Sequence, residues 1–124
     1  MSSLAISAQG MSTQQKFLEV ISANIANSET TKTPDGTPYK RQVAVAHNDA
    51  LTGGVNTSVV EDARPGRMVY DPGHPDANAD GFVEYPNVDV NTELVDLMIA
   101  RRVHEANATV FHAAKDMLRR AIDI

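Results

Sequence analysis

The sequence predicts an α+β fold in which two long terminal helices pack as an antiparallel, coiled-coil-like pair, with a small β-rich insert between them. Residues 3–27 and 91–124 both have apolar side chains at spacings of three and four, which is typical of one face of a helix. The segment between them holds all six Pro and six of the seven Gly, which favours turns and short strands. We therefore divide the chain into an N-terminal helix (1–31), a β-rich insert (32–88) and a C-terminal helix (89–124).

The N-terminal helix is expected to run from Ser3 to about Asn27 and to be marginally stable alone. Gly10 lowers its helix propensity by about 1 kcal/mol relative to Ala, and two Gln residues interrupt its apolar row. Polar residues near Asn27, whose side chains bond to nearby backbone, and then Pro34 favour termination there. The apolar row consists of Leu4, Ala8, Met11, Leu18, Ile21 and Ile25.

The insert is expected to contain short strands joined by tight turns. Runs with β-branched residues at 39–46, 55–60, 67–70 and 82–85 are typical of strands. Gly53 and Gly54 favour a turn between the first two runs. The loop from Asp71 to Asp76 is expected to be rigid, because its two Pro fix φ while its Gly allows the chain to reverse.

The C-terminal helix contains neither Pro nor Gly. At 1.5 Å per residue it would span roughly 50 Å, which exceeds the width of a domain of this size. Asp89, Asn91 or Thr92 can cap its start, and Glu93 in the first turn suits the helix dipole. Its main apolar row is Val95, Ile99, Val103, Ala106, Val110, Ala113, Met117, Ala121 and Ile124, and a second row is Leu94, Leu97, Leu118 and Ile122.

These two rows make an apolar surface wider than the shorter N-terminal helix can cover. We expect the main row to pack on the N-terminal helix and the second row to be available to other molecules. The alternative is an ordinary helical hairpin that caps a β-sheet in a monomer.

Composition excludes several classes of function. The net charge is −5, with 16 acidic against 11 basic residues and no basic run longer than a pair, which argues against nucleic acid as a partner. Cysteine is absent, so disulfides and thiolate metal sites are excluded. We expect no cleaved secretory signal, because the start has neither a basic region nor an unbroken apolar region, and no membrane insertion, because no apolar stretch approaches the length of a span.

The candidate catalytic or metal residues lack a convincing context. His104 and Glu105 begin like a zinc-protease helix, but Ala108 stands where the second His is needed. Carboxylates surround His74 in the 71–76 loop, without the spacing of a calcium loop. We therefore expect no catalytic residue, cofactor, metal or small-molecule substrate. Two alternatives stay open: a small metal-dependent enzyme centred on His74 and Asp76, and a soluble coiled-coil adaptor.

Several sequence blocks resemble the axial proteins of the bacterial flagellum, and among them the proximal rod proteins. The resemblance covers nearly the whole chain. Two departures are His104, where the family usually has an aromatic residue, and Leu94, where an acidic residue and Met are more usual. The blocks are Ser7-Ala-Gln-Gly-Met11, Asn24-Ile-Ala-Asn27, Pro34-Asp-Gly-Thr-Pro-Tyr-Lys-Arg41, Tyr70-Asp-Pro-Gly-His-Pro-Asp-Ala77, Asp80-Gly-Phe-Val83 and Tyr85-Pro-Asn-Val88.

The resemblance implies a noncatalytic subunit of the basal-body rod in the periplasm, exported through the flagellar type III apparatus without a cleaved signal. Terminal helices of neighbouring subunits would pack into a helical tube that transmits torque and forms part of the export channel. The implied partners are copies of this chain, the adjacent proximal and distal rod subunits, the adaptor between the MS ring and the rod, and the export gate.

Combined with the apolar rows, the resemblance yields two sets of predicted contact residues. The predicted subunit-interface residues are Leu4, Met11, Leu18, Ile21, Asn24, Ile25, Asn27, Leu94, Val95, Leu97, Ile99, Val103, Val110, Met117, Leu118 and Ile122. The predicted loop contacts are Tyr39, Tyr70, Asp71, His74 and Asp76.

Overall fold

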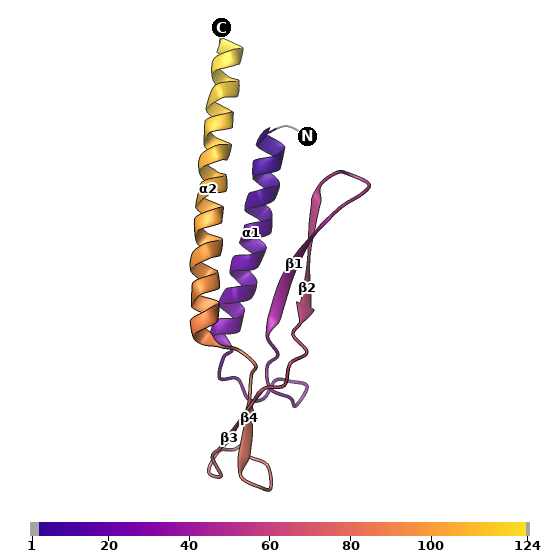
Figure 1. Cartoon of the computed structure of the whole chain (residues 1–124), viewed down its shortest axis with the longest axis vertical. Coiled ribbons are helices and arrows are strands. Elements are labelled where there is room, and N and C mark those ends of the chain that lie inside the picture. Colours follow the sequence, from indigo (N-terminus) through magenta and orange to yellow (C-terminus); the bar gives the residue numbers. More distant parts are fainter. Residues whose placement is uncertain (1–2, 124) are drawn as a thin grey trace.

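In the computed structural model, which describes residues 3–123, two long helices lie side by side in opposite directions (Figure 1). Between them in sequence come two antiparallel hairpins, so the predicted α+β fold is confirmed. No helix within the described residues is long and apolar enough to cross a lipid bilayer. The elements are α1 (Ser3–Ala26), β1 (Gln42–Asn48), β2 (Val55–Glu61), β3 (Arg67–Tyr70), β4 (Phe82–Tyr85) and α2 (Val90–Asp123).

The two hairpins occupy different places. The β1–β2 hairpin lies along α1, whereas the β3–β4 hairpin forms the end of the molecule opposite the C-terminal end of α2 (Figure 1). The register pairs Gln42 with Glu61 in the first hairpin and Tyr70 with Phe82 in the second. Gly53 adopts a φ of 71° in the predicted turn, a conformation that Gly permits without steric cost.

Local polar residues define the ends of both helices. After Ala26, the Asn27 side chain donates a hydrogen bond to the Ala23 carbonyl (2.9 Å), so α1 ends where the polar cluster predicted. At the start of α2, the Asp89 carboxylate accepts hydrogen bonds from the backbone N–H groups of Asn91 (3.0 Å) and Thr92 (3.4 Å). Of the three proposed caps, Asp89 is the one used.

The face of α2 that packs against α1 differs from the predicted one. Glu93 and Ala100 are buried, and Leu97, His104 and Asn107 on the same face are half-buried. We call the predicted main row the outer row, because its larger members are 40–70% exposed. The expectation that this row packs on α1 is therefore wrong, although its last residue, Ile124, lies outside the described residues. The outer-row members meant here are Val95, Ile99, Val103, Val110 and Met117.

The reason lies in the side chains that α1 presents to α2. Ser7 and Asn24 are buried there, and a Cβ added at Gly10 would lie 2.8 Å from Asn107 Nδ2. This close approach suits small and polar side chains better than a row of Val and Ile. In the same contact, His104 Nδ1 is buried without a hydrogen-bond partner among the described residues.

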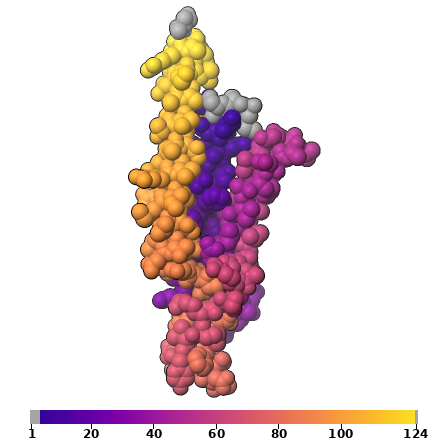
Figure 2. All heavy atoms as spheres, viewed as in Figure 1, coloured from indigo at the N-terminus to yellow at the C-terminus, as the bar shows by residue number. Residues whose placement is uncertain are grey.

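The register of the helix pair leaves the end of α2 without a helical partner among residues 3–123. Gly10 lies against Asn107, and Asn24 bonds Glu93 (3.4 Å). Continuing this antiparallel register places Ser3, the first described residue of α1, opposite residue 114. Residues 115–123 of α2 therefore project beyond the described part of α1, as Figures 1 and 2 show.

Replacing Gly10 with Leu is expected to lower the free energy of unfolding by roughly 1–3 kcal/mol, because the new side chain must displace Asn107. Urea unfolding followed by circular dichroism measures the change. Ser12→Leu, at an exposed position of α1, is the matched control and should cost less. Adding Asn107→Ala to Gly10→Leu should recover part of the loss, and no recovery would contradict the proposed contact.

Candidate subunit-interface site

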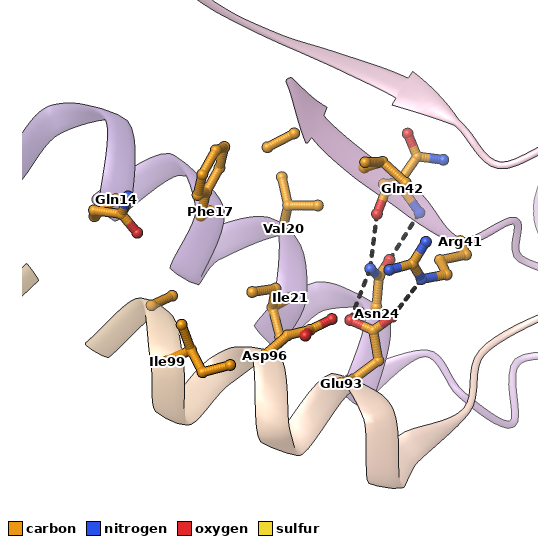
Figure 3. Close-up of a pocket in the computed structure, with 13 residues that line it drawn as sticks. Gln14, Phe17, Val20, Ile21, Asn24, Arg41, Gln42, Glu93, Asp96 and Ile99 are labelled. Atoms are coloured by element: carbon orange, nitrogen blue, oxygen red, sulfur yellow. Dashed lines mark hydrogen bonds and ion pairs between the residues drawn. The ribbon is translucent and has the colours of Figure 1, made fainter. Parts of the chain in front are cut away.

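An ion pair between a half-buried arginine and a buried glutamate joins the insert to the base of the helix pair. The Arg41 guanidinium, just before β1, donates from Nε to the carboxylate of Glu93 in the first turn of α2 (Figure 3). Arg41 Nη1 also lies 3.2 Å from Asp62 Oδ2. Glu93 is only 1% exposed, so burying its carboxylate would be unfavourable without this partner.

Asn24 of α1 completes the ion-pair network with its side-chain amide. Its Nδ2 donates to the Gln42 carbonyl (2.8 Å) and to Glu93 Oε2 (3.4 Å). Its Oδ1 accepts from the Gln42 backbone N–H (2.9 Å) and from the Tyr39 hydroxyl (2.7 Å). One buried Asn thereby holds α1, the start of β1 and α2 together (Figure 3).

Asn87 ties the two hairpins to the same point. Its Oδ1 accepts from the Arg41 backbone N–H (2.8 Å). Its Nδ2 donates to the carbonyls of Asp62 (3.1 Å) and Arg64 (3.0 Å). The segment that leaves β2 and the segment that enters α2 are therefore held together by backbone-directed bonds.

The pKa values of four groups in and beside this network are shifted, and that of Arg64 is raised chiefly by its hydrogen bond to Asp62. Hydrogen bonds from the side chain and backbone of Arg64, and then from Arg41, hold the pKa of Asp62 well below its usual range. Burial raises the pKa of Tyr39, and the negative charge of Glu93 raises it further. Burial lowers the pKa of Arg41, but hydrogen bonds and attraction to Glu93 and Asp62 outweigh burial, so the net shift is upward.

A groove lies above the network, between α1, β1 and α2, with a volume of 290 Å³. Its walls are mainly apolar, and the ion pair of Arg41 and Glu93 forms one end (Figure 3). Ile99 of the outer row lies on its rim and is exposed. The apolar wall residues include Phe17, Val20, Ile21, Val43, Ala44 and Ala100.

The predicted interface residues fall into three groups in the single chain. Those of the outer row of α2 are exposed, as are Leu94, Leu118 and Ile122 of the second row. Leu97 is half-buried. Asn24 is buried inside the subunit and Asn27 bonds the last turn of α1. The predicted interface residues of α1 that are half-buried are Leu4, Met11, Leu18, Ile21 and Ile25.

The predicted loop residues also differ from one another in exposure and in hydrogen bonding. Tyr70 is exposed and stacks edge-on against Phe82, with ring centroids 5.3 Å apart. His74 Nδ1 accepts a hydrogen bond from the Asp76 backbone N–H (3.0 Å), and Asp76 Oδ2 accepts one from the Thr31 hydroxyl (2.6 Å). Asp71 is exposed, whereas Tyr39 bonds Asn24 inside the subunit.

The arrangement of His74 and Asp76 gives no support to a metal-dependent enzyme. The ring nitrogen and the carboxylate described above are bonded within the loop and to Thr31. Among residues 3–123, no three His, Asp or Glu side chains are grouped so that they could hold a metal ion. The site instead consists of the exposed apolar face of α2 beside the hydrogen-bonded network of Arg41, Glu93 and Asn24.

Sequence reasoning missed the pairing of Arg41 with Glu93. Arg41 was singled out only as part of a sequence block, and Glu93 only for its position in the first helical turn. The two residues are 52 positions apart, so no helix or strand periodicity connects them. Each is a charged residue beside an apolar segment of the sequence, with no local partner of opposite charge to account for it. This shared feature could have suggested that the two residues pair.

Two family models match the ends of the chain. One, described as flagella basal body rod protein, matches residues 4–32. The other, described as the C-terminal part of the flagellar basal body rod FlgEFG proteins, matches residues 79–124. The matches cover α1 and α2, so the fold and its helix pair define the class as flagellar basal-body rod proteins.

Curated relatives narrow the class. The chain is 39% identical to the flagellar basal-body rod protein FlgC of Salmonella typhimurium, covering 96% of this chain and 92% of the relative. It is 37% identical to FlgC of Borreliella burgdorferi (99% and 95%) and 35% identical to FlgC of Bacillus subtilis (98% and 95%). The chain belongs to the FlgC family of flagellar basal-body rod proteins, which are structural proteins of the flagellum. The resemblance seen in the sequence blocks is thus confirmed.

Replacing Glu93 with Ala is expected to lower the free energy of unfolding by about 3 kcal/mol, because Arg41 and Asn24 lose a buried charged partner. Chemical denaturation measures the loss. Glu105→Ala, at an exposed position of the same helix, should change it by less than about 0.5 kcal/mol. Equal effects of the two substitutions would contradict a stabilising role for the ion pair.

Stability is expected to depend on Asp62 in the acid range. Because its pKa is lowered in the folded chain, its contribution is present above the unfolded-state pKa, about 3.9, and is lost as the pH falls through the lower folded value. Asp62→Asn should therefore be less stable than the native chain at pH 7, with a deficit that shrinks as the pH is lowered below about 4. A deficit that is constant with pH would argue against the charge. Asp116→Asn, an exposed position of α2, is the control.

Proposed function

We propose that this chain assembles, through the outer row of α2 and the half-buried apolar residues of α1, into the helical tube of the rod. The tube transmits torque and forms part of the export channel. The observation that supports this assembly most directly is the exposed outer row, in which the side chains of Val95, Ile99, Val110 and Met117 are each more than half exposed. Exposed apolar surface of this extent is typical of a protein–protein contact.

The dimensions of α2 support contacts with more than one neighbour. The helix has 34 residues against 24 in α1, and the larger side chains of its outer row are exposed. A helical tube requires contacts between unlike surfaces that do not close on themselves, and one long helix can supply several such surfaces. The groove between α1, β1 and α2 is a further apolar surface for a neighbour.

The remaining partners follow from the place of a rod subunit. We propose contacts with adjacent proximal and distal rod subunits, with the adaptor between the MS ring and the rod, and with the export gate.

The chain would reach the periplasm through the flagellar type III apparatus without a cleaved signal. Recovery of the chain at its full mass from purified basal bodies tests this route, and a shortened mass would overturn it.

The exposed loop residues Tyr70 and Asp71 lie outside the helix pair, where they are placed to distinguish one neighbour from another.

The Val110→Asp substitution tests the assembly surface. Val110 is 52% exposed in the single chain, so the variant should fold normally, but in the tube it would bury an unpaired charge. We expect loss of swimming motility and of the variant chain from isolated basal bodies. Met117→Asp should act in the same way.

Thr109→Asp is the matched control, because it adds the same charge at the adjacent exposed position of the same helix. It should leave motility intact. Normal motility of the Val110→Asp variant would contradict the outer row as an assembly surface. Circular dichroism of the purified variants separates failure to fold from failure to assemble.

The soluble adaptor remains the alternative from another class. An adaptor that binds one helical partner would form a small closed oligomer, whereas a rod subunit forms an open array. Sedimentation of the purified chain at increasing concentration distinguishes the two, since only the open array continues to grow.

A further inference from the structure

Both ends of the molecule expose apolar side chains. The charged residues around them are mainly basic at one end and mainly acidic at the other. We call residues 115–123 the α2 tip and residues 67–85 the hairpin end. They lie at opposite ends of the long axis (Figures 1 and 2). The surfaces differ from each other, as a head-to-tail contact requires.

The α2 tip is apolar on one side and basic overall. It extends about 13 Å past the described start of α1, at 1.5 Å per residue. Met117, Leu118 and Ile122 are 70%, 51% and 74% exposed. Three basic residues, Lys115, Arg119 and Arg120, stand against two acidic ones, Asp116 and Asp123. None of these five forms a salt bridge within the described chain.

The hairpin end is aromatic and acidic. Met68, Tyr70 and Phe82 are 55%, 65% and 39% exposed. Four acidic residues stand against one basic residue, Arg67, whose guanidinium lies over the Tyr85 ring, 5.1 Å from its centroid. Of the four, Asp76 bonds Thr31, whereas the carboxylates of Asp71, Asp80 and Glu84 form no hydrogen bond or salt bridge within residues 3–123.

The hairpin end is also held firmly enough to act as a docking platform. Asp71 N–H bonds the Gly81 carbonyl (2.9 Å), and Asn78 N–H bonds the Phe82 carbonyl (2.8 Å). Asn78 Oδ1 accepts from the N–H groups of Asp80 (3.0 Å) and Phe82 (2.9 Å). The exposed acids and rings are therefore presented by an ordered loop.

We propose that the α2 tip of one copy of this chain docks on the hairpin end of a second copy. The contact places Leu118 and Ile122 against the exposed rings and brings Arg119 and Arg120 to the free carboxylates. The base of α2 is a poorer acceptor, because the hollow beside Met98 is flanked by Arg101 and Arg102, whose charges repel the tip. The proposal rests on the proposed function and names two surfaces that it would use.

Cross-linking between introduced cysteines tests the contact directly, because the native chain contains no cysteine. The double variant Tyr70→Cys/Ile122→Cys replaces the native chain in cells, and purified basal bodies are treated with a short bis-maleimide. Tyr70 ends β3 and Ile122 lies in the last turn of α2; β3 and the end of α2 lie at opposite ends of the molecule (Figure 1), so a product joins different copies. We expect covalent oligomers that extend beyond the dimer.

The matched control is Leu51→Cys/Ile122→Cys. Leu51 is 96% exposed in the β1–β2 turn, away from the hairpin end, so this variant should give no oligomers. Products that stop at the dimer would show a closed pair and overturn the head-to-tail contact. Chain that is present in basal bodies but not cross-linked, or cross-linked only to another protein, would overturn the inference while leaving the proposed function standing. Native chain absent from basal bodies would overturn the proposed function itself.

A charge exchange provides a second test that needs no cysteine. Arg119→Glu/Arg120→Glu and Asp71→Lys/Asp80→Lys should each reduce motility at least tenfold in the number of swimming cells. All four substitutions in one chain should restore motility, because each docking contact then regains opposite charges. Failure of the combined variant to recover, or normal motility of both separate variants, would overturn the proposal.

Discussion

The buried pair of Arg41 and Glu93, with Asn24 bonded to it, is the interaction on which the rest of the structure depends. It fixes the start of α2 against the end of α1 and anchors the insert at the same point. Burying these charges is costly unless every partner is present, so the network permits one arrangement of the three segments. Because the base is fixed by polar bonds, the apolar side chains of Val95, Ile99 and Met117 are not required there and remain exposed.

Much of the fold could be predicted from the sequence because its elements follow local rules. The three-and-four spacing predicted both helices, and the Gly and Pro of the middle predicted the hairpins and the Gly53 turn. The face of α2 that contacts α1 could not be predicted in this way. An apolar row shows only that a surface avoids water, and Val95 to Met117 avoid it equally well inside a subunit or between subunits. The close approach of Gly10 and Asn107 determines which face of α2 contacts α1, and a pattern of hydrophobic residues does not reveal this approach.

The candidate site was predicted in part, for the same physical reason. Exposed apolar residues such as Val110 and Ile122 were identified because they belong to regular rows. Asn24 was identified from its sequence block, but its bonds to Gln42, Tyr39 and Glu93 lie within the subunit. Contacts between residues far apart in sequence depend on the folded path of the chain, and the separate residues give no sign of it. Leu94, Leu118 and Ile122 of the second row are consequently the residues for which sequence and structure agree on exposure, whereas the outer row was expected to pack on α1.

The hydrogen bonds of Asn87 affect the stiffness of the molecule. Its single amide bonds the backbone on both sides of the junction where the hairpins meet the helices. Hydrogen bonds weaken steeply when their angle changes, whereas apolar contacts are non-directional and allow sliding. A junction made of directed bonds resists bending and twisting, so a force applied to the hairpin end is passed to the helices with little lost motion. The chain is stiff where its parts are joined, and its exposed apolar side chains lie along α2.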